Sequence, residues 1–329
     1  TYREAIDRYG SDKPDVRYSM ELHDLGELAA ASGFRVFESV LADQGRVFGF
    51  AAPGLGGYTR KQIDELTESA KKAGAGGLVW LALDVEGGIR GSIVKIVGEQ
   101  MAQDLAAEAG AENGDLVLIV ADQDIVAQEA LGTLRVELAE RHELFDRSVL
   151  SYVWVYQFPM YQWDEDNQRW DATHNPFSAV LPEDEALMTT SSGDPLIASR
   201  DDPAGKARAQ QYDIALNGGE LGGGSVRFHT REMLSKSFAL MGHSAAAQEE
   251  QFSGILEAFE YGAPPHGGIA LGVDRWIALL TDQSNIREVM AFPKTSSGSD
   301  LMLDAPSPIH ADQLDELGLQ LKPTEPPTR

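Results

Sequence analysis

The feature that most constrains this chain is a cluster of five glycines within the seven residues Gly218–Gly224. The segments Tyr212–Gly218 and Gly224–His229 alternate apolar and polar residues with the period of two that is typical of β-strands. Glycine in a simple hairpin costs conformational entropy and offers no side chain to pack. Three consecutive glycines therefore favour backbone that must come close to another group, over a polar hairpin with a solvated outer face.

Each of these two strands is predicted to have one apolar face and one face of chemically useful groups. Asp213 lies opposite the apolar residues of the first strand, and Glu220 lies within the glycine cluster. Carboxylate oxygens are ligands that suit Mg²⁺. Arg227, between two apolar residues of the second strand, has a planar guanidinium that suits a carboxylate or a phosphate. The hairpin therefore predicts a magnesium ion and an anionic ligand.

A second glycine-containing strand, predicted at Gly267–Val273, runs directly into an apolar helix predicted at Asp274–Thr281. Arg275 lies at the start of that helix, where the helix dipole disfavours a cation. An anionic partner such as a nucleotide phosphate would explain this position. Pairing with Asp274 or another acid explains it equally well, so this segment alone leaves both alternatives open.

Charge and composition exclude several classes of function. The chain has 27 Lys and Arg against 52 Asp and Glu, a net charge of −25, which argues against a general nucleic-acid binder but not against a few well-placed arginines. It has no cysteine, which excludes disulfides, thiolate metal sites and a cysteine nucleophile. A P-loop, a dinucleotide-binding glycine fingerprint and a nucleophile elbow are absent, and the histidines lack metal-ligand spacing. No apolar run approaches the roughly 20 residues needed to cross a bilayer.

The length of 329 residues suggests about two domains. Before residue 145 we expect a short amphipathic helix and a turn within Thr1–Arg17, helices at Arg60–Lys72 (with a capping box at Thr59), Ser92–Gly110 and Asp124–His142, and strands at Leu78–Leu83 and Leu116–Ala121. After it we expect a strand at Tyr152–Phe158, a long exposed loop at Pro182–Gln211, helices at Arg231–Gly242 and Ala246–Tyr261, and a frayed tail at Lys322–Arg329.

Together, the glycine hairpin and Gly267–Leu280 resemble the late catalytic strands and motif 3 of class II aminoacyl-tRNA synthetases. The whole chain resembles the C-terminal part of bacterial aspartyl-tRNA synthetases. Further matching segments are Tyr9–Asp15, His174–Ser178, Tyr261–Gly268 and Ile286–Thr295. The resemblance implies an α+β fold, with an antiparallel class II sheet and flanking helices interrupted by an inserted α/β domain. The implied division is 1–20 and 146–329 for the catalytic part and 21–145 for the insertion.

The resemblance also implies a reaction and its residues. Aspartate would attack the α-phosphate of ATP to give aspartyl-adenylate, and the 3′ end of tRNA would then take the aspartyl group. The implied substrates and cofactors are aspartate, ATP and Mg²⁺. The implied roles are catalysis for Arg275 and Glu220, aspartate binding for Arg227, His174 and Asn175, ATP binding for Glu220, Gly272, Asp274 and Arg275, and magnesium binding for Asp213 and Glu220.

Two departures from the family pattern limit what the resemblance implies. The family usually has His-His-Pro-Phe-Thr where this chain has His174-Asn175-Pro176-Phe177-Ser178, and Asn175 cannot carry a positive charge. The family's anticodon-binding barrel, motifs 1 and 2 and the aspartate-gripping loop are not in this chain. We therefore expect a fragment that exposes apolar surface and does not activate aspartate on its own.

The implied partners are aspartate tRNA, with asparagine tRNA as a second candidate, and a second copy in a full-length homodimer. The implied location is the cytoplasm, without a membrane. One alternative is a free-standing, non-catalytic relative that binds aspartate or a nucleotide. Another is an accessory module of tRNA-dependent amidation, which rests only on the inserted block, and the intact motif 3 argues against it.

Overall fold

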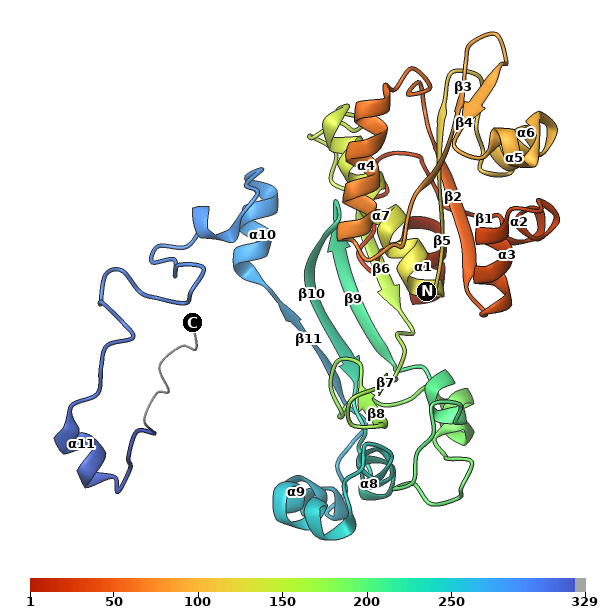
Figure 1. The fold of residues 1–329 in the computed structure, drawn as a ribbon. Helices are drawn as coiled ribbons and strands as arrows, with labels where there is room; N and C mark the ends of the chain where they lie inside the picture. Colours follow the sequence, from red (N-terminus) through yellow and green to blue (C-terminus); the bar gives the residue numbers. More distant parts are fainter. Residues whose placement is uncertain (323–329) are drawn as a thin grey trace. The chain divides into compact units, whose positions relative to one another are not determined.

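The computed structural model describes residues 1–322 and divides the chain into two compact units, Thr1–Gly272 and a second unit that begins at Val273. Figure 1 shows the fold of both units. The expected frayed tail lies, from residue 323 onward, outside the described residues. Within residues 1–322, no helix combines the length and the apolar character needed to cross a membrane.

A five-stranded sheet forms the centre of the first half of unit one, with every neighbouring pair antiparallel. Its strands, in spatial order, are β1 (His23–Asp24), β2 (Arg46–Ala52), β5 (Leu116–Asp122), β3 (Val79–Leu83) and β4 (Ile89–Gly91). Antiparallel pairing makes this block α+β, which corrects the α/β arrangement expected for it, because α/β units have parallel strands.

Helices cover both faces of this sheet (Figure 1). They are α2 (Gly26–Ala31), α3 (Arg35–Ala42), α4 (Arg60–Lys72), α5 (Val94–Val97), α6 (Glu99–Glu108) and α7 (Asp124–Arg141). Leu116, Leu118 and Val120 of β5 pack with residues of α4 and α7, and Val117 and Ile119 pack with residues of α3 and α6. The continuous apolar run of β5 is therefore explained by burial on both faces.

Local sequence signals place α4 correctly and misplace the next helix. The capping box is present, because Thr59 accepts from the backbone N–H of Gln62 and the Gln62 side chain accepts from that of Thr59. The single helix predicted at Ser92–Gly110 is wrong. Gly98 has a φ of 86° and separates α5 from α6, because a left-handed residue cannot continue a right-handed helix.

The short helix α1 (Tyr2–Tyr9) packs against α7 through two glycines. Gly10 ends α1 with a φ of 65°, and a Cβ there would lie 2.1 Å from the carbonyl oxygen of Gln128. A Cβ on Gly132 of α7 would lie 2.4 Å from the Gly10 oxygen. Only glycine at both positions allows this approach, which fixes the start of the turn that follows α1.

Arg135 of α7 fixes the remainder of that turn. Its side chain is buried, with 1% exposed, and donates to the carbonyl oxygens of Asp15 (2.8 Å), Tyr18 (3.1 Å), Ser19 (3.5 Å) and Met20 (3.1 Å). Its guanidinium also lies over the rings of Tyr9 and Tyr18. Burial lowers the pKa of Arg135, yet an arginine stays charged, so the carbonyl dipoles replace the lost water.

A four-stranded antiparallel sheet forms the other half of unit one. Its strands, in spatial order, are β11 (Gly267–Leu271), β10 (Gly219–Val226), β9 (Gln211–Leu216) and β6 (Tyr152–Tyr156). The hairpin between β9 and β10 turns at Asn217 and Gly218, with φ of 51° and 86°. This two-residue turn corrects the expected strand boundaries, which ended the first strand at Gly218 and began the second at Gly224, because β10 begins at Gly219 and contains Gly222–Gly224.

The three consecutive glycines of β10, Gly222–Gly224, allow close contact with both neighbouring strands. A Cβ on Gly224 would lie 1.8 Å from the Gly268 oxygen, and one on Gly222 would lie 2.3 Å from the Ala270 oxygen. A Cβ on Gly223 would lie 2.1 Å from a carboxylate oxygen of Asp213. The expectation that the glycines allow backbone to come close to another group is therefore confirmed.

The remaining elements of unit one surround one end of this sheet (Figure 1). They are β7 (Tyr161–Asp164), β8 (Arg169–Ala172), the 3₁₀ helices η1 (Pro182–Leu187) and η2 (Pro203–Lys206), α8 (Arg231–Leu240) and α9 (Ala245–Glu260). The segment expected as an exposed loop is packed in part, since Asp184, Met188, Asp202 and Ala204 are buried. Because this segment is rich in turn-forming residues, its sequence does not indicate which of its residues are buried.

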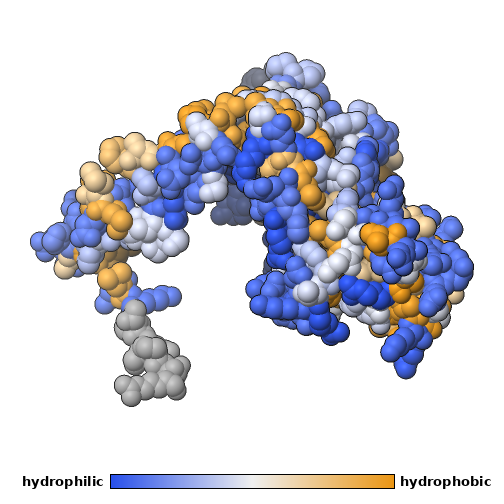
Figure 2. Space-filling model, turned by 90° about the horizontal axis from the view of Figure 1, so that it is seen from above, coloured by the Kyte–Doolittle hydropathy of each residue, from blue (hydrophilic) through white to orange (hydrophobic). Residues whose placement is uncertain are grey.

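One face of the four-stranded sheet carries exposed apolar side chains. The large residues on its edge strands, each between 44% and 54% exposed, are Tyr152, Trp154, Tyr156, Ile269 and Leu271. They share a face with Ile214 by the strand register. Hydrophobic residues also form orange patches on the surface in Figure 2. This agrees with the expectation of exposed apolar surface.

The second unit contains α10 (Val273–Leu280), η3 (Ile286–Glu288) and α11 (Ala311–Glu316). The predicted helix at Asp274–Thr281 is confirmed to within one residue. Among the described residues of this unit, Ala278 is the one buried hydrophobic residue.

Replacing Arg135 with methionine should destabilise the protein, because four carbonyl oxygens, two of them in buried hydrogen bonds, lose their donor. We expect the free energy of unfolding to fall by about 2–4 kcal/mol. The matched control is Arg60→Met, which removes an exposed ion pair with Asp64 and should change stability by less than about 0.5 kcal/mol. Urea unfolding followed by circular dichroism measures both. Equal effects would contradict the role of Arg135.

Gly224→Ala should displace β11, because its new Cβ meets the backbone of Gly268. We expect a loss of about 2 kcal/mol or more and faster hydrogen exchange of the β11 amides. Gly254→Ala in α9 is the matched control, since nothing lies within 4 Å of its Cβ position, and it should stabilise by about 0.5–1 kcal/mol. A harmless Gly224→Ala would show that the close approach is not required.

Candidate active site

Two carboxylates lie on one face of the β9–β10 hairpin. Asp213 pairs with Gly223, and Glu220 pairs with Ala215, two residues further along β9 on the same face as Asp213. A register shift between Glu220 and Gly222 marks a bulge in β10. Bulges re-aim side chains, and here the bulge separates the carboxylate from the glycines that follow it.

Asp213 titrates abnormally for a carboxylate. Burial first, and the charge of Glu220 second, raise the pKa of Asp213 to about 6, while a hydrogen bond with Gln211 opposes the shift. The repulsion between two partly buried carboxylates is relieved when a cation binds both of them. Raised carboxylate pKa values of this kind gather at functional sites.

Arg227 follows directly after β10, and its guanidinium is held by Asn175. Nη1 of Arg227 donates to Oδ1 of Asn175 at 2.6 Å. The same oxygen accepts from the backbone N–H of Phe177 (3.1 Å) and of Ser178 (3.0 Å). All three partners are donors, so an acceptor is required at this position, and a charged histidine could not supply one.

Two hydroxyl groups join the loop that contains Asn175 to strand β10. Oγ of Ser178 donates to Oγ of Ser225 at 2.8 Å, and both residues are buried. An isolated β-bridge also pairs Ser178 with Arg227. The loop that contains His174 and Asn175 is therefore anchored to the sheet at its base.

No carboxylate within residues 1–322 forms an ion pair with Arg227, although the chain has 52 acidic residues. The side chain is partly buried, and its printed partner is the neutral amide of Asn175. A partly buried guanidinium without a counter-charge is costly, and a planar anion would satisfy its donors in pairs. The anionic ligand at Arg227 stays a prediction.

His174 lies near the two carboxylates. Its ring packs edge-on against Phe158, with ring centres 5.0 Å apart. Loss of solvent lowers the pKa of His174, and the charges of Asp12 and Glu220 oppose this shift. The imidazole is thus close enough to Glu220 to respond to its charge, which places three of the predicted site residues in one neighbourhood.

The turn after α1 contributes charges that sequence reasoning did not assign to the site. Asp12 and Lys13 pair with each other at 2.6 Å and act on both His174 and Asp213. Asp15 lies against the hairpin turn, since a Cβ built on Gly218 would lie 3.4 Å from the Cβ of Asp15. The turn-forming composition of Tyr9–Asp15 gives no indication of these contacts.

The predicted ATP-binding residues fall in both units. The backbone N–H of Gly272 donates to the Leu221 oxygen at 2.8 Å, which extends the pairing of β11 with β10 by one residue. Asp274 and Arg275 lie in the first turn of α10, in the second unit, and their ATP-binding roles stay predictions.

Within residues 1–322, no group of three or more His, Asp or Glu side chains has the geometry of a metal site. Asp213 and Glu220 therefore offer two protein ligands at most. That donor set fits Mg²⁺, which usually binds one or two carboxylates and takes its other ligands from phosphates and water.

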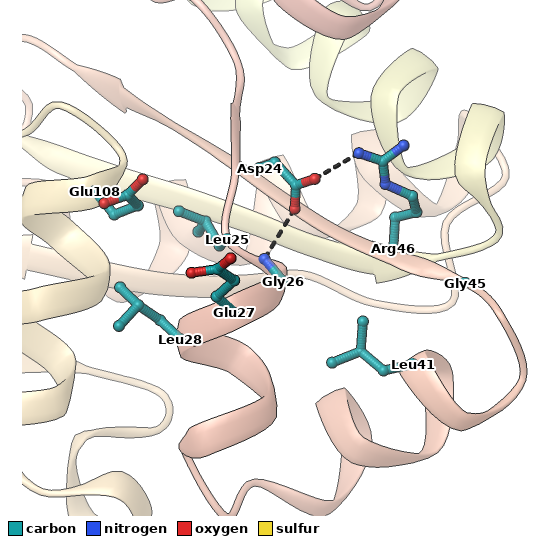
Figure 3. Close-up of a pocket in the computed structure, with 9 residues that line it drawn as sticks. All are labelled: Asp24, Leu25, Gly26, Glu27, Leu28, Leu41, Gly45, Arg46 and Glu108. Carbon is teal, nitrogen blue, oxygen red and sulfur yellow. Dashed lines mark hydrogen bonds and ion pairs between the residues drawn. The ribbon is translucent and has the colours of Figure 1, made fainter.

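A pocket of about 650 Å³ lies elsewhere, against β1, α2 and α3 (Figure 3). Two of its charged groups already bind each other, since Asp24 accepts from Arg46 (2.5 Å) and also from the backbone N–H of Gly26 (2.9 Å). None of the predicted site residues lines it. We therefore place the candidate active site on the β9–β10 hairpin.

Replacing Asp213 with asparagine should stabilise the ligand-free protein in a pH-dependent way. Because the folded pKa of about 6 exceeds the unfolded value of 3.8, the ionised carboxylate costs stability above pH 6 and little below pH 4. The variant should therefore be more stable than the original by about 1–3 kcal/mol at pH 7.5, reduced by partial solvent screening, and nearly equal at pH 4.

Urea unfolding at both pH values measures this difference, because the other titrating groups are common to both proteins. Asp64→Asn, which changes an exposed carboxylate, should show no such gain at pH 7.5. A gain that is equal at both pH values would contradict the unfavourable burial of Asp213.

Comparison with known proteins identifies the family of this chain. The family model for class II tRNA synthetases (D, K and N) matches residues 1–296. The proteins named aspartate–tRNA(Asp/Asn) ligase from Bacillus cereus and Bacillus mycoides are 47% and 46% identical over 322 and 321 residues. These alignments cover 98% and 97% of this chain and 52% of each relative.

The chain therefore spans about half the length of the curated relatives it matches. Among solved structures, the aspartyl-tRNA synthetase of Entamoeba histolytica is 22% identical with a TM-score of 0.30, over 49% of this chain and 25% of that one. A TM-score this low adds nothing to the fold assignment. By its match over residues 1–296, the chain belongs to the class II tRNA synthetases of the D, K and N group.

Proposed function

We propose that this chain is part of an aspartate–tRNA ligase. The observation that carries the proposal is Arg227, a partly buried cation without an acidic partner in residues 1–322, which follows directly after the strand β10 that contains Glu220. A guanidinium in that position favours an amino acid with an anionic side chain over asparagine or lysine. The relatives' name supports aspartate as the amino acid and the tRNAs for aspartate and asparagine as acceptors.

In the first step, Arg227 binds the side-chain carboxylate of aspartate, and Asn175 holds the guanidinium in place. An oxygen of the other carboxylate attacks the α-phosphorus of ATP, and the bond to pyrophosphate breaks. A carboxylate is already an anion, so this step needs no general base. Catalysis would come from positioning and from neutralising charge.

In the second step, the 3′-terminal ribose hydroxyl of tRNA attacks the carbonyl carbon of the adenylate, with release of AMP and one proton. Mg²⁺, when bound, would neutralise charge on the ATP phosphates. Asp213 and Glu220 would hold the ion, which would relieve the repulsion that raises the pKa of Asp213.

Further assignments belong to the same proposal. His174 would contact aspartate, and Gly272, Asp274 and Arg275 would contact ATP, with Arg275 on the γ-phosphate. The inserted domain would comprise residues 21–145, between the catalytic segments 1–20 and 146–329. The complete enzyme would act as a homodimer in the cytoplasm. These assignments rest on family membership and on the residues being present.

We expect the 329-residue chain alone to show no aspartate-dependent exchange between ATP and pyrophosphate, because it spans about half of its relatives. Fusing it to the preceding half of the Bacillus cereus relative should restore exchange. Aspartate should then be preferred over asparagine and lysine by about 100-fold or more in kcat/KM. Exchange by the chain alone, or a preference for another amino acid, would contradict the proposal.

In that fusion, Arg227→Gln should raise the KM for aspartate by about 100-fold and leave the KM for ATP nearly unchanged. Arg231→Gln is the matched control, because Arg231 pairs with Glu249 and Glu260 on the surface of α8 and α9. A fusion that folds and binds aspartate without any exchange would favour the non-catalytic alternative. Equal effects of the two substitutions would remove Arg227 from aspartate binding.

A further inference from the structure

Arg227 also lines a cavity of about 380 Å³. The carboxylates Asp213 and Glu220 do not line this cavity. Its polar lining is Arg227, Asn175 and His266. Its apolar walls come from the loop that contains Asn175, from the residue pair after β10, and from α8 and α9. They consist of Phe177, Phe228, Leu234, Ile255 and Phe259.

The walls of this cavity are held by the core beneath them. Phe228 and Leu234 are buried, and Phe177 and Phe259 pack against the same core cluster. The ring of Phe177 also meets that of Phe238 edge-on, with centres 6.2 Å apart. The cavity is therefore formed before any ligand arrives, which lowers the entropic cost of binding.

The polar groups at the cavity define one end for a ligand. Arg227 uses Nη1 for Asn175 and forms no ion pair with a carboxylate of residues 1–322, so its remaining donors suit an anion. Nδ1 of His266 lies 2.9 Å from the carbonyl oxygen of Pro264 and must donate to it, so Nε2 of the neutral ring is an acceptor. The cavity thus combines one cation with mostly apolar surface.

The size of the cavity exceeds what a carboxylate alone would fill. Ligand sites commonly measure about 300–1,000 Å³ and bury apolar groups against a few placed polar ones. Three phenylalanine rings line this cavity, and aromatic rings pack well edge-on against one another.

We propose that this cavity binds a small organic carboxylate that carries an aromatic ring, with the carboxylate on Arg227 and the ring between Phe177, Phe228 and Phe259. The inference rests on the proposed function in one respect. Such a ligand would share Arg227 with aspartate, and the two would therefore compete.

The test uses the purified 329-residue chain with 3-phenylpropanoate and its uncharged amide, 3-phenylpropanamide, in ligand-observed NMR titrations. The carboxylate should bind at least about 10-fold more tightly than the amide. Arg227→Gln should abolish that difference, and Arg231→Gln should preserve it. Ile255→Trp should weaken both ligands by occupying the cavity, at a partly exposed position where the larger side chain is tolerated.

Equal binding of the two ligands to the original chain, or binding that Arg227→Gln leaves unchanged, would overturn the proposal. So would the absence of binding. Competition by added aspartate distinguishes a failure of this inference from a failure of the proposed function. Phenylpropanoate that binds through Arg227 but is not displaced by aspartate supports the cavity and contradicts the aspartate role. Aspartate that binds through Arg227 while phenylpropanoate does not bind contradicts the cavity alone.

Discussion

The close approach of β10 to its neighbours is the constraint on which the candidate site depends. Gly222 and Gly224 leave no room for a Cβ against the backbone of β11, and Gly223 leaves none against the Asp213 carboxylate. The strand can therefore present Glu220 and Arg227 at its two ends while its middle contributes only backbone. Each of these glycines loses more conformational entropy on folding than alanine would, at a cost of about 0.5–1 kcal/mol. That cost accompanies the close contact between Gly223 of β10 and the Asp213 side chain of β9.

A second set of contacts connects α7 to the turn that follows α1. Gly10 and Gly132 bring α1 against α7, and Arg135 holds the turn that follows through its backbone carbonyls. That turn contains Asp12 and Lys13, whose charges act on His174 and Asp213. A buried arginine more than a hundred residues away in sequence thus helps to position charged groups beside the candidate site.

The sequence predicted the elements whose signals are local. The capping box at Thr59, the buried strand β5 and helix α10 lie where periodicity and capping residues indicate. It misplaced the hairpin turn, because five neighbouring glycines conceal which of them adopt a positive φ. It also missed the break at Gly98 and the β7–β8 hairpin, whose signals are short. Within the candidate site, the residue types alone suggest Asp213, Glu220 and Arg227. The contact between Asn175 and Arg227 and the effect of the Asp12 charge on His174 depend on tertiary packing, which the sequence does not reveal.

The central claim is that Arg227, held by Asn175, binds the side-chain carboxylate of an acidic amino acid. A crystal structure of the fusion protein with bound aspartate tests it most directly. We expect the side-chain carboxylate of aspartate within hydrogen-bond distance of the Arg227 guanidinium, with the contact to Asn175 retained. A structure in which Arg227 instead pairs with an acid of its own chain, and aspartate binds elsewhere, would contradict it.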